Sequence, residues 1–194
     1  MKVVSRLPPN HRGRAYENVG LKIRAFSGTS IHMPIDPFAL AKFAKIRVVE
    51  ASKFREHSPL AVAELTGRSC PNWSAVTLAL PDGWQLSILN PKHTPERKRA
   101  TLMEEICHII LGHEPTRIST DGNHVAFRDY NPINEQTAYG VGAAVLVPYE
   151  ALRAQLQAGK SPKLIARRYG VSIELVLYRI KITMLWKFYK ALAS

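Results

Sequence analysis

The amino-acid sequence predicts an α+β fold, with a small β-sheet built on one hairpin and a helical C-terminal segment. Segments with helical periodicity precede and follow the hairpin instead of alternating with strands. A Pro-Asp-Gly turn between two strand-like segments marks the hairpin itself. A length of 194 residues suits one domain with a small appendage.

The N-terminal part is predicted to form two helices and one strand. Residues 1–14 are polar and basic and are expected to be a flexible arm. Apolar residues at helical spacing predict the first helix over residues 15–26. Asp36 is a suitable cap and Pro37 fits a first turn, so a second helix begins there, and residues 46–49 indicate a short strand.

The hairpin and the most informative helix follow. Residues 73–80 and 84–89 are predicted to be the two strands, joined by the turn of residues 81–83. Thr94 and Pro95 give the next helix a cap and a favoured first residue. Its apolar stripe predicts a helix that is largely buried beside the sheet.

A long loop and a second apolar helix come next. Residues 114–133 are expected to form the loop, and loops of this length are often functional. Asn134 is predicted to cap a helix over residues 135–147. Gly140 and Gly142 lower its helix propensity by up to ~1 kcal/mol each, and close approach of the preceding helix would explain them.

The composition restricts the class of protein. The chain has 27 basic and 15 acidic residues, a net charge of +12, which favours nucleic acid or an acidic surface as partner, or simply a soluble basic protein. No apolar run approaches the ~20 residues that span a bilayer, so we expect no membrane partner. Cys70 and Cys107 do not form a disulfide framework, which favours a reducing cytoplasm.

The helix after Thr94 carries a motif close to that of zinc peptidases. In the pattern His-Glu-x-x-His, two imidazoles one turn apart bind the metal and the Glu is the general base. Glu104, Glu105 and His108 fill these positions here, so a carboxylate replaces one imidazole. Glu104 and His108 share one helix face. Glu105 lies ~100° round the helix, where it reaches the water that attacks a peptide carbonyl.

Other interpretations of the motif stay open. Two Glu and one His on an amphipathic helix are usually a solvated face. A largely buried helix favours the metal, because adjacent buried carboxylates repel one another without a cation. The added carboxylate makes the site harder than a zinc site, which moves its preference toward ions such as manganese or leaves it without metal.

Two neighbouring residues are weaker candidates. His113 lies about 140° round from His108, so it shares the ion only if the helix ends first. We expect it at the helix end, in contact with a ligand rather than with the metal. Cys107 is expected to be a small buried residue rather than a nucleophile, because it has no obvious base partner beyond His108.

Several segments together resemble the ImmA/IrrE family of bacterial metallopeptidases over most of the chain. The matching segments are residues 34–37, the strand after them, residues 89–91, 99–108, 138–148 and 165–172. The resemblance implies a zincin-like peptidase domain over residues 15–158 and a helix-turn-helix-like appendage over residues 159–194. It also implies a divalent metal, zinc or manganese, and cleavage of a cognate helix-turn-helix repressor, which derepresses stress or mobile-element genes.

The resemblance implies a third metal ligand in the Ala-rich helix. In the family this ligand is a Glu at the start of that helix, and the corresponding position here is Thr137. The nearest acidic residue is Glu135, which lies ~200° round the helix from Thr137. Glu135 is expected to serve as the third metal ligand only if the helix begins later than Asn134 indicates. Tyr139 is expected to lie close behind the ligands.

The basic C-terminal segment adds a further interpretation. Ala166, Gly170 and Val176 have the spacing of a helix-turn-helix, and Ser172 would cap its second helix. Alternatively, this segment packs on the core through its apolar residues Ile165, Val171, Leu175, Val176 and Ile180. The basic residues expected to meet DNA phosphates in the first case are Arg167, Arg168, Arg179 and Lys181.

Three functions are consistent with the sequence. The first is a metallopeptidase that acts on a DNA-binding regulator. The second is a catalytically inactive member of the same fold that binds its partner without cutting it. The third is a DNA-binding regulator that uses the basic C-terminal helices.

Overall fold

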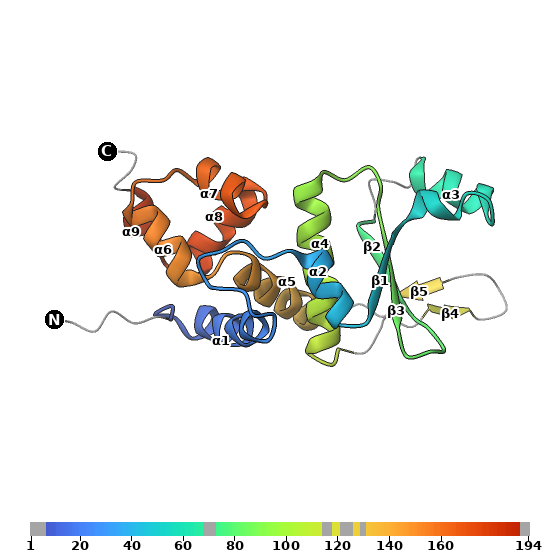
Figure 1. Ribbon diagram of the computed structural model, residues 1–194, viewed down its shortest axis with the longest axis horizontal. Helices are drawn as coiled ribbons and strands as arrows, with labels where there is room; N and C mark the ends of the chain where they lie inside the picture. Colours follow the sequence, from blue (N-terminus) through green and yellow to red (C-terminus); the bar gives the residue numbers. More distant parts are fainter. Residues whose placement is uncertain (1–6, 68–72, 114–117, 121–125, 129–130, 191–194) are drawn as a thin grey trace.

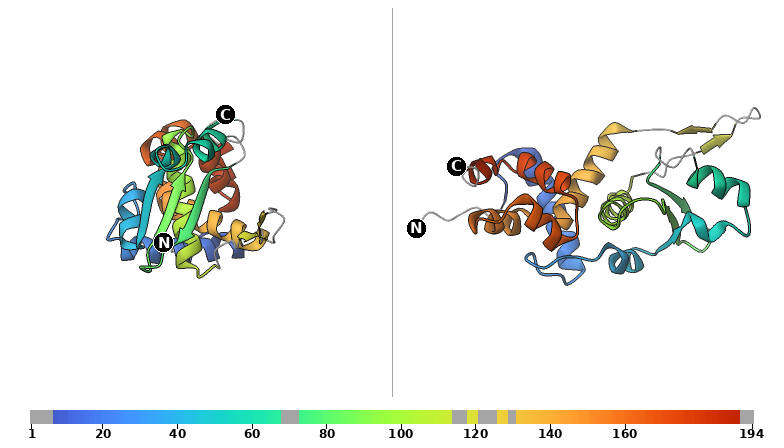
Figure 2. Two further views of the ribbon diagram at one scale, coloured as in Figure 1. Left: turned by 90° about the vertical axis from the view of Figure 1, so that its right-hand side faces the viewer. Right: turned by 90° about the horizontal axis from the view of Figure 1, so that it is seen from above.

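The computed structural model describes residues 7–67, 73–113, 118–120, 126–128 and 131–190 (Figure 1). Within these residues, a three-stranded sheet lies toward one end of the molecule, and the C-terminal helices gather at the other end (Figures 1 and 2). The predicted α+β class is confirmed. Among the described helices, none combines the length and the apolar character that crossing a membrane requires.

The main sheet has the strand order β1–β3–β2, in which β1 spans Ile46–Glu50, β2 spans Ala75–Ala79 and β3 spans Gln85–Leu89. β2 and β3 form the predicted antiparallel hairpin, and Gly83 in its turn has a φ of 78°, which glycine adopts without strain. β1 pairs with β3 in parallel. Helix α4 (Pro95–Ile110) contacts both β2 and β3, so it is the helix beside the sheet that the sequence predicted (Figure 2).

A second, two-stranded sheet projects from the body of the molecule (Figure 1). It consists of β4 (Ile118–Thr120) and β5 (Ala126–Arg128), which pair antiparallel. The sequence predicted a loop over residues 114–133, and that prediction is wrong for these six paired positions. Strands of three residues are too short to show an alternating pattern, so no periodicity signalled them.

The N-terminal helices pack against the helices that follow the sheet. α1 (His11–Phe26) packs on α5, and α2 (Pro37–Phe43) packs on α4 and β1. α1 begins before the predicted residue 15, so residues 11–14 belong to this helix and not to an arm. Gly13 fits there because a Cβ atom would lie 2.6 Å from the carbonyl oxygen of Ile182. The 3-10 helix η1 (Ala51–Phe54) and α3 (Pro59–Thr66) follow β1.

Helix α5 (Pro132–Leu146) begins earlier than predicted. The side chain of Asn131 accepts hydrogen bonds from the backbone N–H groups of Ile133 at 3.0 Å and Asn134 at 3.3 Å, so Asn131 and not Asn134 is the cap. A capping residue followed by Pro also begins α2, α4 and α7. The sequence therefore contained the signal for the correct start.

The two glycines of α5 permit two different close approaches. A Cβ atom on Gly142 would lie 3.4 Å from Cγ of Met103 and 3.5 Å from the backbone nitrogen of Glu104, so α4 approaches here as predicted. A Cβ atom on Gly140 would lie 2.4 Å from the ring of Tyr16. The prediction that Gly140 faces α4 is therefore wrong, because α1 occupies that side of α5.

Helices α6 (Tyr149–Gln157), α7 (Pro162–Tyr169), α8 (Ile173–Ile182) and α9 (Trp186–Lys190) complete the fold. The hydrophobic core continues from α5 into α7 and α8 without a break. The predicted packing residues of this segment are all buried: Ile165, Val171, Leu175, Val176 and Ile180. The apolar residues of this segment therefore pack on the core, which is one of the two alternatives that the sequence left open.

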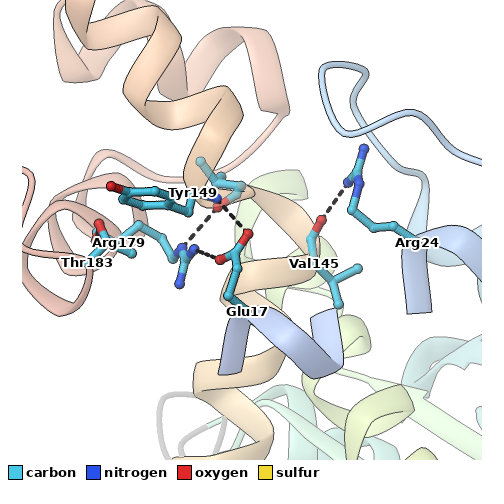
Figure 3. A network of polar contacts seen from close by, with 7 residues as sticks. Glu17, Arg24, Val145, Tyr149, Arg179 and Thr183 are labelled. Carbon is cyan, nitrogen blue, oxygen red and sulfur yellow. Dashed lines mark hydrogen bonds and ion pairs between the residues drawn. The ribbon is translucent and has the colours of Figure 1, made fainter. Parts of the chain in front are cut away.

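A buried polar network joins the N-terminal helix to this C-terminal group (Figure 3). Arg179 of α8 is fully buried and forms an ion pair with Glu17 of α1. Its Nε also donates to the carbonyl of Val147 at 2.9 Å. Glu17 in turn accepts a hydrogen bond from the backbone N–H of Tyr149 at 2.8 Å. α1, the α5–α6 junction and α8 are therefore held together by one set of buried contacts.

Candidate metal centre

The side chains of two glutamates and one histidine meet where α4 contacts α5. One ligand atom from each of Glu104, His108 and Glu135 lies within 4.8 Å of the other two. Glu104 and His108 lie one turn apart on α4, and Glu135 lies in the first turn of α5. The Nε2 atom of His108 is 3.8 Å from Oε2 of Glu135. All three side chains are partly exposed, so ions in solution can reach them.

Glu135 joins this cluster although α5 begins at Pro132. The sequence predicted that Glu135 would reach the other ligands only if the helix began later, and that prediction is wrong. The packing of α5 against α4 brings Glu135, in the first turn of α5, within reach of Glu104 and His108. Thr137, the position that the resemblance implies, donates its hydroxyl to the carbonyl of Ile133 at 2.7 Å within its own helix.

The distances and the donor types fit a divalent ion. Two ligands that each lie about 2.1 Å from one ion are at most about 4.2 Å apart. The 3.8 Å between Nε2 of His108 and Oε2 of Glu135 satisfies this limit, and the ligand atoms of all three residues lie within 4.8 Å of one another. Two carboxylates and one imidazole are also donors that divalent ions commonly use. The geometry and the donor types of the cluster therefore fit a divalent metal ion.

The end of α4 brings His113 back onto His108. Ile110 is the last residue of α4, Leu111 caps it, and Gly112 takes the left-handed conformation with a φ of 68°. The backbone N–H of His113 then donates to the carbonyl of His108 at 2.9 Å. This turn places Nδ1 of His113 3.1 Å from Nδ1 of His108. Because Nε2 of His108 faces Glu135, the contact at Nδ1 orients its ring.

Burial shifts the pKa values of the groups around the cluster. Burial lowers the pKa of His113, against a smaller opposing effect of Glu135, so the ring is neutral at neutral pH and able to accept a hydrogen bond. Burial raises the pKa of Tyr139, and the charge of Glu104 adds to the shift. Burial raises the pKa of the free Cys107 thiol far above its usual range, which excludes a thiolate nucleophile as the sequence predicted.

The remaining residues of the site lie next to the cluster. Glu105 follows Glu104 on α4 and is partly exposed. Tyr139 lies one turn after Glu135 on α5, and its ring packs edge-on against Tyr178 of α8 with 5.0 Å between ring centroids. Sequence reasoning missed Tyr178. No signal in the sequence identified it, because the contact depends on how α8 packs against α5.

The basic residues of the C-terminal helices divide into two groups. Arg167, Arg168 and Lys181 are exposed. Arg179 is fully buried in its ion pair with Glu17, so the prediction that it meets DNA phosphates is wrong. The physical reason is its position one turn after the buried Leu175, on the face of α8 that packs into the core. A DNA contact by the three exposed residues stays a prediction.

Comparison with known protein families identifies the chain. Residues 87–181 match the family model of a peptidase family described as the IrrE N-terminal-like domain. The match runs from β3 into α8, so it includes α4 and α5 with all three members of the cluster. A search of curated proteins finds no match to the chain. The chain belongs to the ImmA/IrrE family, a family of metallopeptidase type.

Proposed function

We propose that this protein is a metal-dependent endopeptidase that cleaves a cognate helix-turn-helix transcriptional repressor. Cleavage of the repressor would derepress stress or mobile-element genes. The observation that carries the proposal is the meeting of Glu104, His108 and Glu135 next to Glu105. Family membership supports the peptidase chemistry. The substrate class rests on the resemblance of the sequence to the family.

The side chains have distinct parts in this reaction. Glu104, His108 and Glu135 would hold a divalent ion, zinc or manganese, which would supply Lewis acidity to the peptide carbonyl and to water. Glu105 accepts the proton of the attacking water and passes it to the leaving amine. The neutral ring of His113 would accept a hydrogen bond from the Nδ1–H of His108, so that Nε2 of His108 would be the ligand atom.

The finer fold assignment belongs to the same proposal. The three-stranded sheet with α4 and α5 corresponds to a zincin-like core. α7 and α8 correspond to a helix-turn-helix-like unit over residues 159–194. Two features support this second assignment: Gly170 turns the chain with a φ of 62°, and the side chain of Ser172 accepts a hydrogen bond from the N–H of Leu175 at 3.2 Å.

Replacement of the general base tests the function. We expect the wild type to cut its cognate helix-turn-helix repressor at one position, seen by electrophoresis and mass spectrometry. Glu105→Gln keeps the size of the side chain and removes its basicity, so cleavage should fall by about 10²–10⁴-fold. Metal content and the circular dichroism spectrum should be unchanged. Cleavage at the wild-type rate by Glu105→Gln would contradict the proposal.

A catalytically inactive partner-binding protein is the alternative. It is favoured by Glu104, which stands where the peptidase pattern has a ligand histidine. In that case the wild type should form a stable complex with the intact repressor, and the complex should survive a chelator. The same assay therefore separates the two functions.

A further inference from the structure

The donor set of the metal centre differs in kind from that of the peptidase pattern. Because Glu104 takes the place of an imidazole, the three donors are two carboxylate oxygens and one imidazole nitrogen. Imidazole is a ligand that zinc uses readily, whereas carboxylate oxygens suit harder ions such as manganese. The exchange of one imidazole for one carboxylate should therefore weaken the binding of zinc more than the binding of manganese.

The negative charge of the centre strengthens the binding of divalent ions in general. Glu104, Glu105 and Glu135 together carry three negative charges when ionised, and a divalent ion neutralises two of them. The arrangement with two imidazoles, one ligand Glu and one base leaves no excess charge. Attraction by charge alone acts on all divalent ions equally. The preference of the centre between zinc and manganese is therefore set by its donor types and not by its charge.

The exposure of the site leaves space for additional oxygen ligands. The side chains of His108 and Glu135 are 20% and 27% exposed, which is more open than a closed structural site. Each carboxylate also binds through one oxygen or through both. Such a site has room for six ligands that are mostly oxygen atoms, which is the coordination that manganese prefers. Zinc favours a compact arrangement of four ligands.

We infer that Glu104 sets the metal specificity of this centre and shifts it from zinc toward manganese. This inference rests on the proposed function, because it concerns the ion that the peptidase uses. Zinc binds more tightly than manganese at a given site as a rule. The measurable quantity is therefore the ratio of the manganese Kd to the zinc Kd, which is smaller here than in a centre with two imidazoles.

Restoration of the second imidazole tests this inference. The Kd values of Mn²⁺ and Zn²⁺ are measured by competition with a chromophoric chelator for the full chain and for Glu104→His. We expect Glu104→His to raise the ratio of the manganese Kd to the zinc Kd by roughly tenfold or more, the scale on which single changes near a metal alter affinity. Glu135→His also replaces a ligand carboxylate with an imidazole, in this case on α5, and should shift the ratio in the same direction. Glu96→His, in the first turn of α4, controls for an added histidine.

The outcomes distinguish the inference from the proposed function. A ratio that is unchanged in both Glu104→His and Glu135→His, while the wild type binds metal, overturns the inference and leaves the peptidase standing. A wild type that binds neither ion contradicts both. If Glu104→His loses its helical circular dichroism, the ratio for Glu135→His alone decides.

Discussion

His113 illustrates how a single residue outside the ligand set fixes the geometry of the cluster. Its N–H closes the last turn of α4 on the carbonyl of His108, and its ring then lies against the ring of the same residue. Gly112 makes this possible because its left-handed conformation reverses the chain directly after the helix. One short turn therefore ends the helix and orients a ligand.

Loss of the His113 ring should weaken metal binding without loss of the fold. His113→Ala removes the partner of Nδ1 of His108, so the ligand ring gains rotational freedom. We expect the metal Kd to rise about 10–100-fold, as is typical when the partner of a ligand is removed. The measurement is metal titration of the purified variants. His57→Ala, an exposed histidine far along the sequence, should bind like the wild type. Equal affinity in His113→Ala and the wild type would refute the positioning role.

At the scale of the helices and strands, local sequence signals predicted most of the fold. The hairpin followed from its Pro-Asp-Gly turn, and the starts of α2 and α4 followed from a capping residue before Pro. The start of α5 at Pro132 carried the same signal, and the prediction overlooked it in favour of Asn134. The pairing of β4 with β5 had no signal, because three-residue strands show no periodicity.

The candidate site was predictable only where its residues lie on one helix. The i and i+4 spacing of Glu104 and His108 fixes their common face. Glu135 depends on the crossing of α4 and α5, which spacing within a single helix does not report. The burial of Arg179 likewise depends on a partner in α1, more than a hundred residues away in the sequence. Sequence patterns therefore did not determine the contacts between elements that lie far apart in the sequence.

The two glycines of α5 should respond differently to the same substitution. Gly140→Ala places a methyl group 2.4 Å from the buried ring of Tyr16, so we expect a loss of roughly 1–3 kcal/mol in the free energy of unfolding. Gly142→Ala makes only an ordinary contact of 3.4 Å with Met103 and gains helix propensity. It should be as stable as the wild type or more stable. Urea denaturation measures both. A Gly140→Ala variant with wild-type stability would contradict the packing of α1 on α5.

At the scale of the whole molecule, the N-terminal helix is part of the same core as the C-terminal helices. The ion pair between Glu17 and Arg179 lies at the centre of this arrangement, and both side chains are almost fully buried (Figure 3). A buried charge without its partner is strongly unfavourable. The stability of the entire chain, including the helices of the metal centre, should therefore depend on this pair.

Removal of one member of the pair should destabilise the protein more than removal of both. Glu17→Gln leaves the guanidinium of Arg179 buried and uncompensated, so we expect a loss of about 3–5 kcal/mol in the free energy of unfolding. The double variant Glu17→Gln/Arg179→Met removes the buried charge as well and should recover part of this loss. Urea denaturation of the single and double variants provides the measurement. A double variant that is less stable than Glu17→Gln would contradict this account of the pair.

The central claim is that side chains from two helices hold one divalent ion, and metal content measures it directly. Elemental mass spectrometry of the purified, tag-free protein, after incubation with zinc or manganese and removal of free metal, should find close to one ion per chain. Glu135→Ala should lose this ion, whereas Thr137→Ala, two positions along the same helix, should retain it. Equal metal content in Glu135→Ala and the wild type, or a wild type without metal, would contradict the claim.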